Sequence, residues 1–146
     1  MVSDEGRGMA GLSFGTGELL EGVGVPTLIT DNHRVALWVN QPFCDLFGVD
    51  GGPDRLVGRT MTEIAMRVST DFRDPRKFLD GIVAAVEGGV AVSGDVLERV
   101  DGGMYRRSYY PVRIDGAISA HVWRYDDVTD MHRRTVALER STAVLQ

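Results

Sequence analysis

The residues best suited to acid–base chemistry lie near the C-terminal end of the sequence. His121 can exchange protons near neutral pH, and Asp126 or Asp127 could orient its ring for general acid–base catalysis. Successive residues of a strand point to opposite faces, so at most one of these aspartates shares the side of His121. Asp127 is also well placed to cap a following helix. A small acid–base enzyme stays an alternative, but we expect no enzymatic activity.

Other catalytic and metal-binding signatures are absent from the sequence. It contains no nucleophile elbow and no phosphate-binding loop. The three histidines, His33, His121 and His132, have no short ligand spacing, and the single cysteine, Cys44, excludes both an internal disulfide and a multi-cysteine metal site. We therefore predict no metal site, and the sequence assigns no role to Cys44.

The last third of the chain is predicted to form three consecutive antiparallel strands. Alternation with a period of two starts at Asp95, and aspartate-glycine turns separate the runs 95–100, 104–114 and 117–127. One face is mostly aromatic and consists of Leu97, Tyr105, Arg107, Tyr109, His121, Trp123 and Tyr125. The other face is mostly aliphatic and consists of Val96, Met104, Tyr110, Val112, Ile118, Ala120 and Val122. Neither face is polar, so we expect helices to cover one and the N-terminal segment or a second subunit to cover the other.

The aromatic face is the candidate binding surface. Tyrosine and tryptophan combine a large apolar area with a polar tip, which suits a pocket for a small molecule, although the same side chains could simply fill a core. Arg107 would bring a full charge into the interior, which is costly without an anionic partner. Its partner could be a carboxylate-bearing ligand, or it could be Glu98 or Asp126 in an internal ion pair. We expect the ion pair, because it needs no further molecule.

Upstream of these strands, the sequence predicts a hairpin and two short helices. The runs 25–30 and 35–40 are rich in β-branched residues and flank a polar turn. Asn40 can cap a helix over QPFCDLF, which Gly48 can end in a left-handed conformation. A second short helix is predicted to start near Thr60, with Ile64 and Met66 among its apolar residues.

A longer helix is predicted over PRKFLDGIVAAVE. Asp74 is its N-cap, with proline at the first helical position, and Gly88 and Gly89 mark its end. Gly81 lies inside this helix at a cost of about 1 kcal/mol relative to alanine, so we expect another backbone or a ligand to approach it closely. Five strands, with the helices between the second and third, predict an α+β fold.

Composition indicates one globular domain. The chain has 146 residues, 43% of them hydrophobic and 25% charged, with a net charge of −5. The acidic balance argues against a nucleic-acid partner, and the absence of a long apolar run or signal peptide predicts a cytoplasmic protein without a membrane anchor. Residues 1–17 are glycine-rich and predict a flexible leader, with a short helix over GELLEGVG after it.

Several short motifs, in this order and spacing, resemble the PAS domains, which are sensory modules of signalling proteins. They are VPTLITDNHRVALWVNQPFCDLFG, LVGRTM, the YYPV strand after its turn, and W-x-x-x-DVT at the end. The resemblance extends from about residue 18 to residue 132. It implies a five-stranded antiparallel sheet whose inner face and helices enclose a ligand pocket, and it points the aromatic set inward.

The sequence departs from two subclasses of this family. Cys44 lies on the first helix and the cysteine motif of the flavin photosensors is missing, so flavin photochemistry is not expected. The long helix has no histidine, so only His121 could serve as a haem ligand, and we do not expect haem either. The identity of a cofactor or ligand stays unknown.

The C-terminal segment, 129–146, is predicted to be a signalling helix that follows a sensory domain over 18–128. Apolar residues and threonines recur at steps of three and four, at Val128, Met131, Thr135, Leu138, Thr142 and Leu145. A narrow seam of this kind favours a parallel coiled coil in a homodimer, and the alternative is a helix that folds back over the sheet. The expected partner is an output domain such as a histidine kinase, phosphatase or cyclase. A ligand-free dimerisation module is the remaining alternative.

Overall fold

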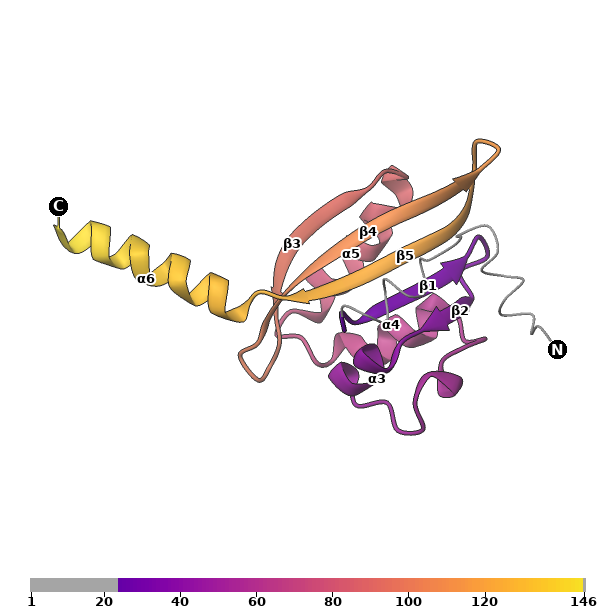
Figure 1. Ribbon diagram of the computed structural model, residues 1–146, viewed down its shortest axis with the longest axis horizontal. Coiled ribbons are helices and arrows are strands. Elements are labelled where there is room, and N and C mark those ends of the chain that lie inside the picture. Colours follow the sequence, from indigo (N-terminus) through magenta and orange to yellow (C-terminus); the bar gives the residue numbers. More distant parts are fainter. Residues whose placement is uncertain (1–23, 146) are drawn as a thin grey trace.

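The structure is an α+β domain built on one antiparallel sheet, as predicted. The computed structural model describes residues 24–145, without the side chains of Asp95 and of residues 142–145. The strands are β1 (Thr27–Asp31), β2 (Ala36–Val39), β3 (Val92–Glu98), β4 (Met104–Ile114) and β5 (Ala117–Asp127), in the spatial order β2-β1-β5-β4-β3. The helices α3 (Gln41–Phe47), η1 (Pro53–Arg55), α4 (Met61–Ser69) and α5 (Pro75–Gly88) lie between β2 and β3 in the chain, and α6 (Thr129–Leu145) follows β5 (Figure 1).

Asn40 joins the first hairpin to α3. Its Oδ1 atom accepts hydrogen bonds from the Phe43 backbone N–H at 3.1 Å and from the Thr27 N–H at 2.9 Å. Its Nδ2 atom donates to the Val25 carbonyl at 2.7 Å. Gly48 ends α3 with φ = 64°, a left-handed conformation that glycine adopts at little cost. The predicted cap and stop of this helix are confirmed.

The caps of α4 and α5 are also those that the sequence predicts. The Thr60 side chain accepts a hydrogen bond from the Glu63 N–H, and the Asp74 side chain accepts one from the Lys77 N–H. Within α4, Ile64 is buried, whereas the apolar residue Met66 is 58% exposed.

The predicted bounds of β4 and β5 are confirmed at both ends; β3 is present, but its predicted bounds are wrong. β3 begins at Val92 and ends at Glu98, three and two residues earlier than the predicted run. Its pairing with β4 shifts between Ser93 and Val96, and this bulge interrupts the period-two pattern that located the strand. The β4–β5 turn has positive φ at Asp115 and at Gly116, as tight hairpin turns require.

The aromatic face of the last three strands points toward the helices. Tyr109, Trp123 and Tyr125 are each 1% exposed, and Leu97 is 4% exposed. The other face is apolar but less covered: Ala120 is buried together with Ile29, whereas several of its neighbours are partly exposed. The alternation of side chains in the sequence therefore assigned the two faces correctly.

An aromatic cluster forms the centre of the core. Phe47 contacts Tyr125 edge to face at a ring-centroid distance of 5.5 Å, and Phe78 stacks on Phe72 at 4.7 Å and on Tyr125 at 6.2 Å. Burying each such ring stabilises the fold by about 2–3 kcal/mol. The cluster joins α3 and α5 to β5 and so fixes the position of the helices over the sheet.

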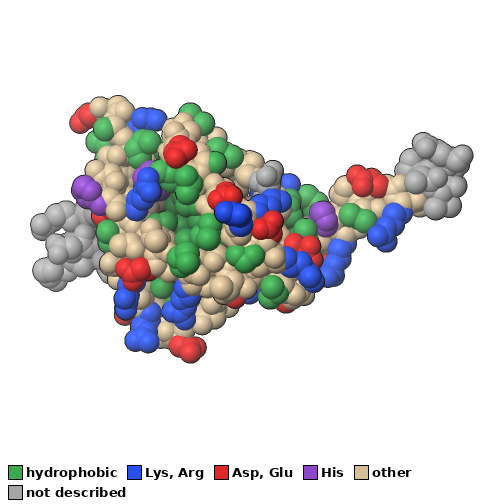
Figure 2. All heavy atoms as spheres, turned by 180° about the vertical axis from the view of Figure 1, so that it is seen from behind, with side chains coloured by type: hydrophobic (Ala, Val, Ile, Leu, Met, Phe, Trp, Pro, Cys, Tyr) green, Lys and Arg blue, Asp and Glu red, His purple; other side chains and the backbone are tan. Residues whose placement is uncertain are grey.

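The C-terminal helix α6 projects away from the domain and does not fold back over the sheet (Figure 1). Acidic and basic side chains are both exposed along it (Figure 2). The predicted leader, residues 1–17, and the helix predicted after it lie outside the described residues.

Candidate binding site and helix junction

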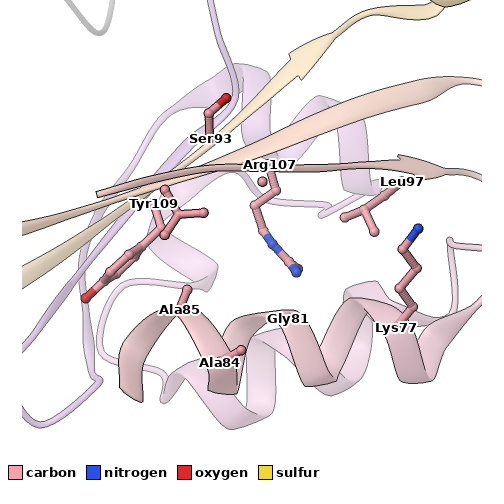
Figure 3. Close-up of a pocket in the computed structure, with 10 residues that line it drawn as sticks. Lys77, Gly81, Ala84, Ala85, Ser93, Leu97, Arg107 and Tyr109 are labelled. Atoms are coloured by element: carbon pink, nitrogen blue, oxygen red, sulfur yellow. The ribbon is translucent and has the colours of Figure 1, made fainter. Parts of the chain in front are cut away.

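A cavity of about 300 Å³ lies between α5 and the strands β3 and β4. Its charged groups are Arg107, from β4, and Lys77, from α5, whose side chains both extend into the space between helix and strands (Figure 3). The remaining lining is mostly small or apolar and includes Gly81, Ala84, Ala85, Val92, Leu97 and Tyr109. This volume is at the lower end of the range for small-molecule pockets.

Arg107 is the buried cation of this cavity. The residue is 8% exposed, and its Nη1 atom donates a hydrogen bond to the Phe78 carbonyl at 2.8 Å. The guanidinium lies over the Phe78 ring, with Cζ 4.8 Å from the ring centroid, and 6.0 Å from the centroid of Trp123. Burial raises the pKa of the Tyr125 hydroxyl, and the neighbouring Arg107 partly opposes that rise. The charge is thus accommodated by a carbonyl, the Tyr125 hydroxyl and aromatic faces.

The predicted ion pair of Arg107 is wrong for both proposed partners. Glu98 pairs with Arg73 at 2.6 Å, and Asp126 pairs with Arg124 at 3.5 Å. Among the side chains that the structure describes, no carboxylate forms an ion pair with Arg107. The reason is geometric: Asp126 alternates to the outer face, and Glu98 is paired with Arg73 beside the strand end.

Two glycines make room for Arg107. A Cβ atom at Gly81 would overlap the Nη2 atom of Arg107, so the guanidinium can hold its present position only while residue 81 lacks a side chain. A Cβ atom at Gly94, in the β3 bulge, would lie 2.5 Å from the Arg107 carbonyl oxygen. A group does approach Gly81 closely, but it is the Arg107 side chain and not the backbone or ligand that the sequence led us to expect.

A second cavity, of about 170 Å³, lies on the other side of α5, between α4, α5, β1 and β5. Trp123 and His121 contribute to its wall, and the rest of the lining is largely apolar. The Nε1 atom of Trp123 is buried and has no hydrogen-bond acceptor among the described residues. A buried unpaired donor costs about 1–3 kcal/mol, so a water molecule or a ligand acceptor in this cavity would stabilise it.

Tyr109 and His121 form a hydrogen bond between the two cavities. The Tyr109 hydroxyl lies 2.7 Å from Nδ1 of His121, and the two rings stack. Burial lowers the pKa of His121, an effect to which Arg34 adds and which Asp31 opposes. Burial also raises the pKa of Tyr109. The imidazole is therefore neutral at pH 7, as expected of a packed core histidine.

The acid–base pair proposed from the sequence is not formed. His121 bonds to Tyr109, whereas Asp127 bonds to Thr129 and Asp126 pairs with Arg124. The described part of the chain contains no cluster of three or more potential metal ligands. Within the same residues, no helix is long and apolar enough to cross a membrane.

The structure divides the seven predicted pocket residues into three groups. Leu97, Arg107 and Tyr109 line the first cavity, and His121 and Trp123 line the second. Tyr125 packs within the aromatic core, and Tyr105 lies at the end of the sheet, so neither lines these cavities.

Sequence reasoning missed the helical side of the first cavity. Lys77, Gly81 and Ala84 lie on one side of α5 at spacings of four and three, and Ala85 adjoins them. The signal available in the sequence was Gly81 followed at helical spacing by Ala84 and Ala85, which predicts a helix surface with little side-chain bulk.

The junction between β5 and α6 is tied to the start of β4. Asp127 Oδ1 accepts hydrogen bonds from the Thr129 N–H at 2.9 Å and from the Thr129 hydroxyl at 2.6 Å, which lowers the pKa of Asp127. The Met104 N–H donates to Thr129 Oγ1 at 2.9 Å, and the Val128 N–H donates to the Met104 carbonyl at 2.9 Å. The first turn of α6 is thereby fixed to two strands.

Comparison with solved structures supports the fold. An RNA-binding light-oxygen-voltage receptor matches with a TM-score of 0.59 and 21% identity, over 88% of this chain and 38% of its own length. The PAS domain of BvgS from Bordetella pertussis matches with a TM-score of 0.56 and 18% identity, over 85% and 93%. A sensory box histidine kinase/response regulator from Burkholderia thailandensis matches with a TM-score of 0.55 and 16% identity, over 90% and 98%.

The family model of the PAS fold matches residues 20–133, which is most of the chain. No curated protein matches the sequence. The sheet order, the helices between β2 and β3 and the C-terminal helix agree with that family. The chain belongs to the PAS fold family.

Proposed function

We propose that this domain binds a small molecule between its sheet and helices and relays binding through α6 to an output domain. The observation that carries the proposal is that the strands lining the cavities also hold the first turn of α6. β4 contributes Arg107 to the first cavity and Met104 to the α6 junction. β5 contributes Trp123 to the second cavity and ends at Asp127. A shift of either strand therefore moves the base of the helix.

Dimerisation through α6 is the second element of the proposal. Met131 is 61% exposed and Leu138 is 68% exposed, at positions of the predicted seam. A helix with such a narrow apolar seam is stabilised chiefly by a partner helix. A second copy of α6 is the partner that fits best, since identical seams pair in register. The output domain would be a histidine kinase, a phosphatase or a cyclase.

The relay can be tested with a spin label at the end of α6. Cys44 is 1% exposed and does not compete for the label, so Ser141→Cys places one label on each α6. Protein as purified is compared with protein that has been unfolded, dialysed to remove bound molecules and refolded. A change in the distance between the two labels supports the relay. A matched label at Asp54→Cys, on the exposed η1, reports any change of the domain itself.

The alternative is a dimerisation module with a filled core and no ligand. It predicts identical distances between the α6 labels in the purified and the refolded protein. Sedimentation velocity gives the oligomeric state in the same samples, and a monomer at all concentrations would contradict the dimer.

A further inference from the structure

The charge of Arg107 is buried without a counter-charge among the described side chains. A guanidinium has five N–H donors: Nη1 of Arg107 donates to the Phe78 carbonyl, and the side chain also hydrogen-bonds to the neutral Tyr125 hydroxyl. Carbonyl and aromatic contacts reduce the cost of burial, but they do not neutralise the charge. An anion in the adjoining cavity would do so.

Lys77 brings a second positive charge to the same cavity. It lies one helical turn before Gly81, and its side chain rises from α5 toward Leu97 on β3, as Figure 3 shows. None of the described side chains that line this cavity is acidic. The cavity is therefore locally positive in a chain whose net charge is −5. An accidental surplus of cations is less expected in an acidic protein than in a basic one.

The remaining lining restricts the body of the ligand. Ala84, Ala85 and Leu97 offer apolar contacts, and the volume of about 300 Å³ suits a compact molecule. An inorganic ion would leave these apolar walls without a partner. An organic acid satisfies both parts of the cavity, because its carboxylate matches the planar fork of the guanidinium and its carbon body packs on the alanines.

We infer that the cavity between α5, β3 and β4 binds the carboxylate of a small organic acid through Arg107, with Lys77 at its rim. This inference rests on the proposed sensory function and names its ligand class. The two glycines are part of the site, since Gly81 admits the guanidinium and Gly94 allows the β3 bulge to approach the Arg107 backbone.

Binding can be measured by NMR titration of the purified chain with acetate, succinate, benzoate and inorganic phosphate, with benzamide as the uncharged match of benzoate. We expect the amide signals of Gly81 and Gly94 to move with at least one organic acid but not with benzamide, while Gly116, in the β4–β5 turn, stays unchanged. Equal shifts with benzoate and benzamide, or binding of phosphate alone, would overturn the inference. So would the absence of binding by all of these probes at millimolar concentration.

Substitutions separate a bound carboxylate from a general charge effect. Arg107→Met should weaken binding by about ten- to a hundredfold, as expected for a charge-assisted hydrogen bond. Lys77→Met should weaken it by roughly two- to fivefold, because Lys77 is exposed. The control is Arg106→Met, which changes the neighbouring residue on the opposite face of β4. This variant should bind the organic acid with the affinity of the parent chain. If the methionine variant fails to fold, Arg107→Lys provides a second test. It keeps the positive charge but loses the planar guanidinium, so it should also weaken binding of the organic acid.

One internal source of compensation lies outside the described side chains. Asp95 follows Gly94 in the bulge of β3, and Asp95→Asn removes its charge. If Asp95→Asn and Arg107→Met both lose stability, and no organic acid binds the parent chain, the counter-charge is internal and the inference falls. Unchanged or tighter carboxylate binding by Asp95→Asn supports it.

The outcomes for the ligand class and for the relay are distinguishable. If a bound molecule is retained and α6 responds to its removal, but Arg107 variants bind it normally, the carboxylate assignment fails and the sensory proposal stands. If organic acids bind through Arg107 without any change between the α6 labels, the assignment stands and the relay fails.

Discussion

The guanidinium group of Arg107 occupies the space that Gly81 leaves open on the inner side of α5. Glycine inside a helix costs about 1 kcal/mol relative to alanine, so Gly81→Ala would stabilise an isolated helix. In this protein we expect the opposite: the added methyl group must displace the guanidinium, which should lower the free energy of unfolding by about 1–3 kcal/mol. Urea denaturation measures the difference.

The matched control for this substitution is Gly88→Ala. Gly88 is the last residue of the same helix, and an added Cβ atom there meets nothing within 4 Å. This variant should be neutral or more stable by up to about 1 kcal/mol. A Gly81→Ala protein at least as stable as Gly88→Ala would show that Arg107 does not need the space.

Arg107→Met should change the free energy of unfolding by less than about 1 kcal/mol, or increase it, in the absence of ligand. The reason is that replacing an uncompensated buried charge by an apolar side chain of similar length removes a desolvation cost. Thermal and urea unfolding, with Arg106→Met as the control, provide the measurement. A loss of more than about 3 kcal/mol would mean that the charge is already paired inside the domain.

Stability should fall in mild acid because of His121. Burial holds its pKa below the ordinary value of 6.5, so between the two values the unfolded chain binds a proton that the folded protein does not. The free energy of unfolding should therefore decrease as the pH falls from about 6.5 toward the folded pKa. His121→Gln should remove this pH dependence of the free energy of unfolding. His33→Gln, at an exposed position, should keep it. Parallel slopes in the parent chain and His121→Gln would refute the assignment.

Thr129→Val should loosen the base of α6. The substitution removes the hydroxyl that donates to Asp127 and accepts from the Met104 N–H, at an expected cost of about 1 kcal/mol. Because the Thr129 hydroxyl is the main cause of the low pKa of Asp127, that pKa should rise toward its usual range. NMR titration of Asp127 and hydrogen exchange of the first turn of α6 report both effects.

Thr135→Val is the control for the junction. The Thr135 hydroxyl donates to the Met131 carbonyl within α6 and contacts neither strand. It should leave the pKa of Asp127 and the exchange of the first turn unchanged. If both valine variants behave alike, the contact between Thr129 and Met104 does not hold the helix.

Local signals in the sequence were sufficient for most of the fold. Caps such as Asn40 and Asp74 depend on neighbours within three residues, and the alternation along β4 and β5 depends on the pleat alone. The start of β3 was misplaced because its bulge shifts the register, and a bulge depends on the partner strand.

The contacts of the Arg107 side chain could not be predicted from local signals in the sequence. Sequence alternation placed this side chain inside, but its contacts come from α5, whose angle over the sheet is set by packing of the aromatic core. Glu98 and Asp126 lie on the strands that flank β4, but both carboxylates pair with other arginines. The depth of the guanidinium between helix and sheet follows only from the tertiary structure.

Native mass spectrometry of the purified chain, run beside the Arg107→Met variant and a denatured sample, shows whether the interior holds a small acid through Arg107. The parent chain should carry the added mass of a small organic acid, which denaturation should release and which the variant should lack. Growth and purification must not remove small organic acids from the sample. Under that condition, equal masses for the native parent chain and its denatured control would contradict a ligand bound in the interior.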